Sequence, residues 1–301
     1  MTQDLAPRCG FVAVLGPPNA GKSTLINRLV GTKVSIVSPK VQTTRTRVLG
    51  IALTGPAQVI FIDTPGIFAP KRRLDRAMIQ AAWGGASDAD RVALILDSQR
   101  GFDEEAASII AGLKERHQRA DLVLNKIDLI RREKLLSLAE EASAQGIFDA
   151  VFMISAASGD GTDALLAHIA ADLPEGPWHF PEDQVSDMPM RLLAAEVTRE
   201  QIFLQLHQEL PYAATVETEG WTEMENGSVR IDQVIFVRKD SQKAIMLGKG
   251  GTRVKMIGER ARKELAEMME RPVHLFLHVK VRENWQDERS VYRDLGLDYN
   301  V

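Results

Sequence analysis

The stretch FVAVLGPPNAGKSTLINRLV, residues 11–30, decides the fold of the first half of the chain. Its apolar start predicts a strand, its end predicts a helix, and GPPNAGKS between them fits the pattern G-x-x-x-x-G-K-[ST]. Glycines in such a loop let backbone N–H groups approach phosphate oxygens, and the start of the helix adds positive potential. We therefore interpret residues 16–23 as a phosphate-binding loop rather than as a glycine-rich turn.

Short apolar runs recur after this loop and alternate with helical patterns, at 48–53, 58–64, 91–97, 121–128 and 151–156. Strands that alternate with helices predict an α/β domain whose mainly parallel sheet is covered on both faces. The segment LPEGPWHFPEDQVSDMP, residues 173–189, interrupts the alternation with four prolines, which remove backbone donors and fix φ. We place a first domain at 1–174, a linker at 175–189 and a second domain at 190–301.

The second domain has a different pattern. It predicts a helix at 190–209, strands at 213–223 and 229–239 joined by a turn at Glu225-Asn226-Gly227-Ser228, a helix over about 252–269 and a strand at 274–281. With a helix before the glycine-rich stretch near 248, the order is α-β-β-α-α-β. This order predicts a smaller α+β domain.

Composition limits the classes of protein that fit. The chain has 301 residues, 45% of them hydrophobic, and a formal net charge of −4, so any site for nucleic acid must be a local patch. A single cysteine, Cys9, excludes an intramolecular disulfide and fits a reducing cytosol. No apolar run approaches the roughly 18 residues that span a bilayer. We expect a cytoplasmic protein.

Three further motifs lie where other predicted strands end. Asp63-Thr64-Pro65-Gly66 is expected to reach Mg²⁺ through its aspartate and a γ-phosphate through the Gly66 N–H. Asn125-Lys126-Ile127-Asp128 favours guanine, because the carboxylate of Asp128 accepts from the ring N1–H and the 2-amino group. Ser155-Ala156-Ala157 would bring backbone N–H groups to guanine O6. Ligands of open α/β sheets bind at this edge, so the sequence predicts a site for GTP or GDP with Mg²⁺.

The segment 38–45, SPKVQTTR, lies where the first switch is expected, and a switch needs a threonine to complete the Mg²⁺ shell. Thr43 and Thr44 are both candidates, and we favour Thr44. The predicted Mg²⁺ ligands are thus Ser23, Thr44 and Asp63. The predicted nucleotide-binding residues are Gly16, Pro17, Pro18, Asn19, Ala20, Gly21, Lys22, Ser23, Thr24, Asp63, Thr64, Pro65, Gly66, Asn125, Lys126, Asp128, Ser155, Ala156 and Ala157.

The group that positions the attacking water is not evident. Ile67 follows the aspartate motif, where Ras-like enzymes have a glutamine, so we expect a slow intrinsic rate. We interpret Arg45, Arg47, Lys71, Arg72 and Arg73, near the switches, as surface charges. Asn19 resembles the asparagine of GTPases that use K⁺ as a counter-charge, and we hypothesise such an ion here. The candidate catalytic residues are Lys22, Thr44, Gly66 and Asn19.

The second glycine loop, Gly248-Lys249-Gly250-Gly251, lacks the Lys-Ser pair of a nucleotide loop. A G-x-x-G loop between two helices is how KH domains hold single-stranded RNA or DNA. Residues 238–263 carry nine basic and two acidic side chains, which gives a local positive footprint. The predicted RNA-binding residues are Gly248, Lys249, Gly250, Gly251, Arg253 and Lys255.

The whole chain resembles the Era family of GTPases through GPPNAGKS, VQTTRTR, DTPGI, NKID, ISA, LGKGG and HLFLHVKVRENW. The resemblance implies a type II KH domain and a monomeric switch that binds the single-stranded 3′ end of 16S rRNA while GTP-bound. It further implies a role in assembly of the small (30S) ribosomal subunit and peripheral contact with the inner face of the membrane. The alternative is a constitutive RNA-binding module in which the nucleotide is only structural.

Overall fold

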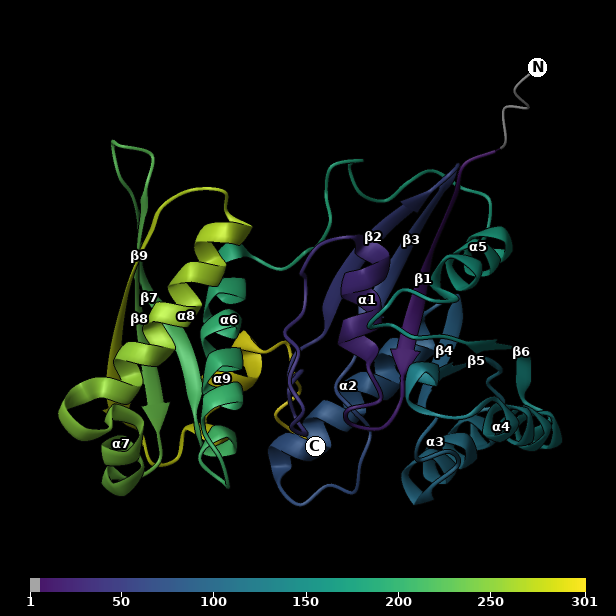
Figure 1. Cartoon of the computed structure of the whole chain (residues 1–301), viewed down its shortest axis with the longest axis horizontal. Coiled ribbons are helices and arrows are strands. Elements are labelled where there is room, and N and C mark those ends of the chain that lie inside the picture. The colour runs from purple at the N-terminus through teal and green to yellow at the C-terminus, as the bar shows by residue number, and fades with distance from the viewer. Residues whose placement is uncertain (1–5) are drawn as a thin grey trace. The chain divides into compact units, whose positions relative to one another are not determined.

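The structure is a computed structural model that describes residues 6–301 (Figure 1). Its contacts divide the chain into two compact units. The first unit contains residues 6–35, 44–187 and 292–301, and the second contains residues 36–43 and 188–291. The boundary near 187 lies two residues from the end of the expected linker. Two short segments depart from the sequence order: residues 36–43 belong to the second unit, and residues 292–301 belong to the first.

The first unit is built on a six-stranded sheet with the order β2-β3-β1-β4-β5-β6. Only β2 is antiparallel to its neighbour, which confirms the mainly parallel α/β sheet. Its strands are β1 (Arg8–Leu15), β2 (Val48–Thr54), β3 (Ala57–Asp63), β4 (Arg91–Asp97), β5 (Ala120–Asn125) and β6 (Phe148–Met153). The expected strand at 121–128 is too long, because β5 ends at Asn125 and Ile127–Leu129 forms a 3-10 turn.

Helices cover both faces of this sheet, as Figure 1 shows. One core contains Leu25 and Ile26 of α1 with Leu165 and Ile169 of α5, and the other contains side chains of α2, α3 and α4. Because both faces are buried, the strands read as continuous apolar runs rather than alternating ones. The helices are α1 (Lys22–Val30), α2 (Arg73–Asp88), α3 (Glu104–Glu115), α4 (Arg132–Gln145) and α5 (Thr162–Asp172).

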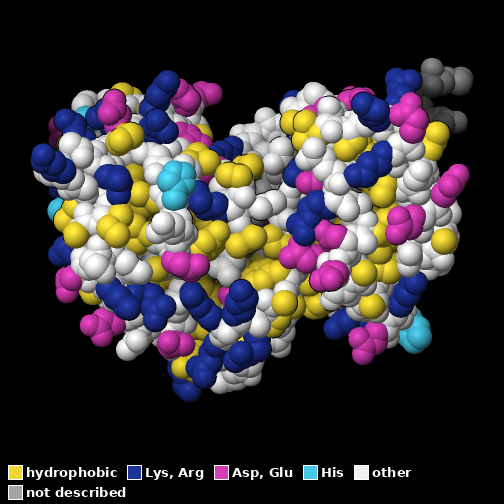
Figure 2. Space-filling model, turned by 60° about the horizontal axis from the view of Figure 1, so that its bottom comes forward, with side chains coloured by type: hydrophobic (Ala, Val, Ile, Leu, Met, Phe, Trp, Pro, Cys, Tyr) yellow, Lys and Arg dark blue, Asp and Glu magenta, His cyan; other side chains and the backbone are white. Residues whose placement is uncertain are grey.

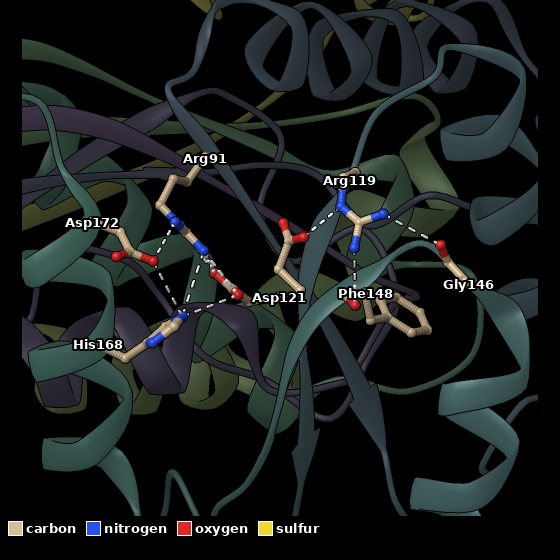
Figure 3. A network of polar contacts seen from close by, with 8 residues as sticks. Arg91, Arg119, Asp121, Gly146, Phe148, His168 and Asp172 are labelled. Atoms are coloured by element: carbon tan, nitrogen blue, oxygen red, sulfur yellow. Dashed lines mark hydrogen bonds and ion pairs between the residues drawn. The ribbon is translucent and has the colours of Figure 1, made fainter.

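A polar network lies where β4 and β5 begin, at the opposite ends of these strands from the motifs (Figure 3). Arg91, which begins β4, binds the buried carboxylate of Asp121 through two nitrogens at 2.8–3.1 Å. Arg91 also binds Asp172 at the end of α5 at 2.7 Å, and His168 lies 3.3 Å from Asp121. Asp121 is 1% exposed, so these partners offset the cost of burying its carboxylate.

The expected linker packs along the first unit. The Ile51 N–H donates to the Val185 carbonyl at 2.9 Å, and the Trp178 indole donates to the Pro56 carbonyl at 3.0 Å. The Gln58 side chain bonds the backbone of His179 and Phe180 at 2.8–3.0 Å. These contacts satisfy backbone groups that a segment outside helices and strands would otherwise leave to water.

The second unit has a three-stranded sheet, order β7-β8-β9, in which β7 and β8 form an antiparallel hairpin and β9 runs parallel to β8. The expected order α-β-β-α-α-β is confirmed, with a helix on each side of the GKGG loop. The elements are α6 (Met190–Gln205), β7 (Thr215–Glu223), β8 (Val229–Val237), α7 (Asp240–Leu247), α8 (Thr252–Met268) and β9 (Val273–Val281).

After β9 the chain forms a short turn around Trp285, whose indole N–H donates to the Ala213 carbonyl at 3.0 Å, and then α9 (Arg289–Asp294). Residues 292–301 belong to the first unit. There the Thr46 hydroxyl donates to the Leu295 carbonyl at 2.7 Å, and the Arg73 guanidinium lies 4.7 Å from the centre of the Tyr299 ring. In the part of the chain from residue 6 onward, no helix is long and apolar enough to cross a membrane.

Candidate functional site

The phosphate loop connects β1 to α1 at the end of the sheet where the parallel strands finish. Lys22 is 6% exposed, and its ammonium donates to the carbonyls of Gly16 at 3.0 Å and Pro17 at 2.9 Å. Burial lowers the pKa of Lys22 to about 8, although the charges of Asp63 and Glu105 act in the opposite direction. The ammonium therefore lies inside the loop, where it can bind phosphate oxygens.

The predicted Mg²⁺ ligands come together beside this loop. The Ser23 hydroxyl is 2.8 Å from Asp63 Oδ2 and 3.0 Å from the Thr44 hydroxyl, and Thr44 lies 3.4 Å from the same carboxylate oxygen. Thr43 points elsewhere, because its hydroxyl bonds Ser38 at 2.6 Å and the Lys40 carbonyl at 2.7 Å. Between the two candidates, the geometry favours Thr44.

Asp63 provides a test of whether a cation fits. The residue is completely buried, and its Oδ1 atom has no hydrogen-bond partner among residues 6–301. Burial raises the pKa of its carboxyl, although the nearby hydroxyls of Ser23, Ser35 and Thr44 and the charge of Lys22 oppose the shift. A Mg²⁺ ion would satisfy this oxygen and offset the cost of the buried charge, so the donor set fits Mg²⁺ held by one carboxylate, two hydroxyls, water and phosphate. Within the described residues no cluster of three His, Cys, Asp or Glu side chains provides another metal site.

The predicted guanine site is held by Asn125. Its amide donates to the Ala20 carbonyl at 2.8 Å and accepts from the Ala156 N–H at 2.9 Å, so one buried side chain joins the phosphate loop to the Ser155-Ala156-Ala157 motif. Gly21 makes this possible, because a Cβ there would lie 2.2 Å from the Asn125 amide nitrogen. Gly21 also has φ of +101°, which L side chains rarely adopt.

Lys126 and Asp128 follow in the same loop. The Lys126 ammonium is fixed by Asp97 at 2.7 Å and by the Asn19 carbonyl at 2.8 Å, so its stem extends across the site. Asp128 is exposed, as a carboxylate that reads a base edge must be before the base arrives. Two residues of this site were not predicted from the sequence: Asp97, which ends β4, and Arg28, whose guanidinium donates to the carbonyls of Ala156 and Ala157. The position of Asp97 at the end of a parallel strand was the available signal.

The other predicted residues of this site lie in the same loops. The Thr64 hydroxyl donates to the Val14 carbonyl at 2.7 Å, which anchors the aspartate motif to β1. Gly66 passes close to Pro18, and the N–H of Ile67 donates to the Gly16 carbonyl at 3.2 Å. Of the predicted nucleotide-binding residues, Gly16, Pro17, Pro18, Ala20, Pro65, Ser155 and Ala156 are buried, Ser23 and Thr24 are half-buried, and Asn19 and Ala157 are exposed.

The basic residues near the switches do not all behave as expected. Arg47, Lys71 and Arg72 are exposed, and Arg73 is half-buried against Tyr299. The interpretation of Arg45 as a surface charge is wrong, because this residue is 2% exposed. A sequence cannot reveal this burial, because it depends on how a loop folds back on the unit. Ile67 is buried among core side chains, so it offers no polar group to orient water.

The second unit presents the GKGG loop between α7 and α8. Gly248 has φ of +73° and Gly250 has φ of +61°, and Lys249 and Gly250 are exposed. The Arg253 guanidinium donates to the Ile245 carbonyl at 2.8 Å, so it closes the end of α7 beside the loop. The segment 238–263, which contains this loop, carries nine basic and two acidic side chains. Figure 2 shows Lys and Arg side chains interspersed with acidic and hydrophobic ones on the surface.

A groove of about 460 Å³ adjoins the loop and runs between α8 and β9. Apolar side chains line its floor and charged ones its rim, as a site for unstacked bases beside a phosphate chain requires. Lys255 was predicted from the sequence and the other lining residues were not, because they come from a helix and a strand whose facing surfaces meet only after folding. The lining residues are Val254, Lys255, Gly258, Glu259, Arg262, Leu275 and Leu277.

Two family models match the chain, a 50S ribosome-binding GTPase over residues 11–126 and a KH domain over residues 209–286. GTPase Era of Rhizobium meliloti (strain 1021) is 61% identical over 292 residues, which are 97% of this chain and 93% of that protein. GTPase Era of Agrobacterium fabrum is 59% identical over 295 residues, which are 98% of this chain and 93% of that protein.

Solved structures of Era extend the comparison. A crystal structure of an Aquifex aeolicus Era variant bound to GDP·AlF₄⁻ is 38% identical, with a TM-score of 0.91 over 96% of this chain and 99% of that one. A crystal structure of Era with MgGDPNP and nucleotides 1506–1542 of 16S ribosomal RNA is 38% identical, with a TM-score of 0.92 and the same coverage. By its identity, coverage and two domains, this chain is a GTPase with a C-terminal KH domain and belongs to the Era family.

Proposed function

We propose that this GTPase is a switch that binds 16S rRNA in its GTP-bound state and assists assembly of the small ribosomal subunit. The observation that carries the proposal is the presence of two glycine-rich loops with different neighbours in one chain. GPPNAGKS lies beside a converged set of Mg²⁺ ligands and a guanine motif. GKGG lies beside an open groove rimmed by basic side chains, and a related Era was crystallised with a 16S rRNA segment.

In this proposal GTP or GDP occupies the loops at the ends of β1, β3 and β5. Lys22 and the loop N–H groups bind the phosphates, and Ser23, Thr44 and Asp63 hold Mg²⁺ directly or through water. Asp128 and Asn125 select the base. Mg²⁺, when bound, neutralises charge that develops on the phosphates during hydrolysis. Gly66 reports the γ-phosphate through its N–H. These assignments are supported by the distances within the site.

In the second unit the GKGG loop and its neighbours hold the RNA. Backbone N–H groups of residues 248–251 approach two or more phosphates, and Lys249 and Lys255 add charge beside them. Bases stack into the groove floor formed by Val254, Leu275 and Leu277. We propose the single-stranded 3′ end of 16S rRNA as the RNA, because only unpaired bases can enter such a groove and a related Era was crystallised with nucleotides 1506–1542 of 16S ribosomal RNA.

The test is RNA affinity in two nucleotide states. An oligonucleotide with the 3′-terminal sequence of 16S rRNA is titrated against the protein with GDP and with a non-hydrolysable GTP analogue, at fixed salt. An oligonucleotide of equal length and scrambled sequence measures the non-specific part. We expect tighter binding of the 16S sequence with the GTP analogue. Equal affinity in both states would instead support a constitutive RNA-binding module in which the nucleotide is only structural.

We further propose that K⁺ stimulates hydrolysis through Asn19, which is exposed at the tip of the phosphate loop with φ of +62°. A monovalent cation there would supply charge where other GTPases place an arginine finger. Turnover is compared in K⁺ and in Na⁺ at equal ionic strength, for the unchanged protein and for Asn19→Ala. The same rate in both salts would rule out the ion.

The remaining proposals concern the state of the protein in the cell. We propose a monomer that carries out its assembly role on the 30S subunit in the cytoplasm and contacts the inner face of the membrane peripherally. Sedimentation at micromolar concentration tests the first part. Co-sedimentation with anionic vesicles, with neutral vesicles as the control, tests the last. Recovery of 30S precursors with the protein from cells tests the assembly role.

A further inference from the structure

Helix α6 buries charged side chains that the nucleotide and RNA sites do not use. Glu196, Arg199 and Glu200 are 8%, 1% and 4% exposed. The spacing of residues 196, 199, 200 and 203 places them on one face of the helix. Charged residues are almost never this buried unless they are paired, so this face must have specific partners.

The partner is the segment 36–43, which belongs to the second unit and contains neither helix nor strand. Its backbone polar groups are bound by α6. The Val37 N–H donates to Glu200 at 2.6 Å, and the Arg199 guanidinium donates to the carbonyls of Gln42 and Thr43. The Lys40 ammonium donates in return to the carbonyl of Phe203. A segment without its own hydrogen-bond ladder is thus fixed at both ends.

Arg199 is itself held in place. Its Nε donates to Glu196 at 2.8 Å, a second nitrogen binds the other carboxylate oxygen, and the guanidinium lies 5.1 Å from the centre of the Phe203 ring. A planar guanidinium that is bidentate to a carboxylate has little remaining freedom. Residues of α6 therefore fix the direction in which the Arg199 N–H groups point toward the segment 36–43.

The segment ends next to the Mg²⁺ ligands. Arg199 holds the carbonyl of Thr43, and the peptide group that this carbonyl shares with the nitrogen of Thr44 is planar. The hydroxyl of Thr44 is the group that lies 3.0 Å from Ser23 and 3.4 Å from Asp63. One peptide plane therefore separates the buried arginine from the residue that would complete the Mg²⁺ shell.

We propose that Arg199, braced by Glu196, is a positioning residue for GTP hydrolysis, because it holds the Thr43 carbonyl where the Thr44 hydroxyl reaches Mg²⁺. The inference rests on the proposed role of Thr44. Because Thr44 binds the ion only when a γ-phosphate is present, Arg199 should affect the GTP state and not the GDP state.

The experiment separates positioning from stability by a paired design. Arg199→Met keeps the apolar stem but leaves the Glu196 charge buried alone, which destabilises the protein. The double variant Glu196→Gln/Arg199→Met removes that charge and still lacks the donors to Thr43. Thr44→Ala tests the Mg²⁺ ligand itself. Arg91→Met, which breaks a buried ion pair in the first unit away from the switches, is the control for lost stability.

The measurements are the affinities for GDP and for a non-hydrolysable GTP analogue, the Mg²⁺ dependence of kcat, and the thermal midpoint. We expect the double variant to recover much of the midpoint that Arg199→Met loses. We also expect it to keep a loss of about tenfold or more in kcat and in analogue affinity, with unchanged GDP affinity and a higher Mg²⁺ requirement. Thr44→Ala should show the same pattern, and Arg91→Met should lower only the midpoint.

The outcomes distinguish the role of Thr44 from the role of Arg199. Unchanged hydrolysis and Mg²⁺ requirement in Thr44→Ala would remove the proposed ligand, and with it the basis of the inference. A defect in Thr44→Ala together with normal kcat and analogue affinity in the double variant would keep the ligand and overturn the role of Arg199. Equal losses of GDP and analogue affinity in the double variant would also overturn it, because they would indicate a structural role.

Discussion

The ammonium nitrogen of Lys22 lies 3.0 Å from the carbonyl oxygen of Gly16, within the loop that it would use to bind phosphate. The same nitrogen is 2.9 Å from the Pro17 carbonyl, and the residue is buried. Burial lowers the pKa of Lys22 to about 8, against the opposing influence of Asp63 and Glu105. The protonation of this lysine is therefore sensitive to what occupies the loop.

A bound nucleotide should raise this pKa, because phosphate oxygens bring negative charge to the ammonium. Above pH 8, binding must then take up a proton, so affinity should fall by up to about tenfold per pH unit, whereas below pH 8 this dependence disappears. Titration calorimetry of GDP at pH 7 and pH 9, in buffers with different ionisation enthalpies, measures the uptake. Absence of proton uptake at pH 9 would contradict the lowered pKa of Lys22.

The same shift affects the stability of the nucleotide-free protein. Between about 8 and 10.5, the unfolded chain holds a proton on Lys22 that the folded chain has lost. The contribution of Lys22 to the free energy of unfolding should therefore increase as the pH rises through this window. Denaturant midpoints with and without GDP, compared at pH 7.5 and pH 9.5, check the sign. If raising the pH increases the free energy of unfolding equally with saturating GDP, the increase does not come from Lys22.

Asp128→Asn should reverse the base preference of the site. The amide can no longer accept from both the N1–H and the 2-amino group of guanine as an anion does. Loss of charge-assisted hydrogen bonds should lower GDP affinity by about tenfold or more. Xanthosine diphosphate, which has a carbonyl in place of the 2-amino group, should gain affinity because the new amide can donate to it. The Kd values of the variant for both nucleotides measure this change. A retained preference for GDP would refute the assignment of Asp128.

Gly250→Asp should weaken RNA binding by about tenfold or more, because a carboxylate would face the phosphates. Gly250→Asn is the matched control, since both residues tolerate the positive φ of +61° and a Cβ there meets nothing within 4 Å. Gly248 is a poorer choice for substitution, because a Cβ at that position would lie 2.8 Å from Cβ of Arg253. The effect of the new charge would then be mixed with that of a steric clash. RNA titrations at several salt concentrations, with GTP affinity as an internal check, provide the measurement. Equal RNA affinity for the two variants would count against phosphate contact at this loop.

Arg91→Met should lower the free energy of unfolding by about 3 kcal/mol, because it leaves the carboxylate of Asp121 buried without its main partner. Adding Asp121→Asn should restore most of the loss, since the uncompensated charge is then gone. Denaturant melts of both variants measure the difference. If the single and double variants are equally destabilised, the ion pair is not the cause and packing around β4 and β5 is.

Much of the fold and of the nucleotide site could be predicted from the chain alone. Apolar runs that end in Asp63 and Asn125 indicate parallel strands, and parallel strands bring their ends to one edge of a sheet. The phosphate loop, the guanine motif and the α-β-β-α-α-β order of the second domain are local patterns. Such patterns predict structure well, because the backbone hydrogen bonds that they require form within one element or between neighbouring elements.

Other features depend on contacts that form only when the chain has folded. The choice between Thr43 and Thr44 requires the direction of two side chains in an irregular loop, which no periodicity sets. The burial of Arg45 and the groove between α8 and β9 depend on surfaces that meet only after folding. Asp97 ends its strand, but its ion pair with Lys126, which follows the neighbouring strand, depends on the order of the strands in the sheet.

The sequence by itself determined which chemistry the chain carries, because phosphate loops, base-reading motifs and glycine-rich RNA loops are short stretches whose residue types are dictated by the ligand. Only the tertiary structure decided how those stretches are held. The residues 36–43 lie with the second unit because Arg199 and Glu200, more than 150 positions later, satisfy their backbone groups. Which partner a buried charge contacts is decided by three-dimensional packing, and the spacing of the two residues in the sequence does not predict that contact.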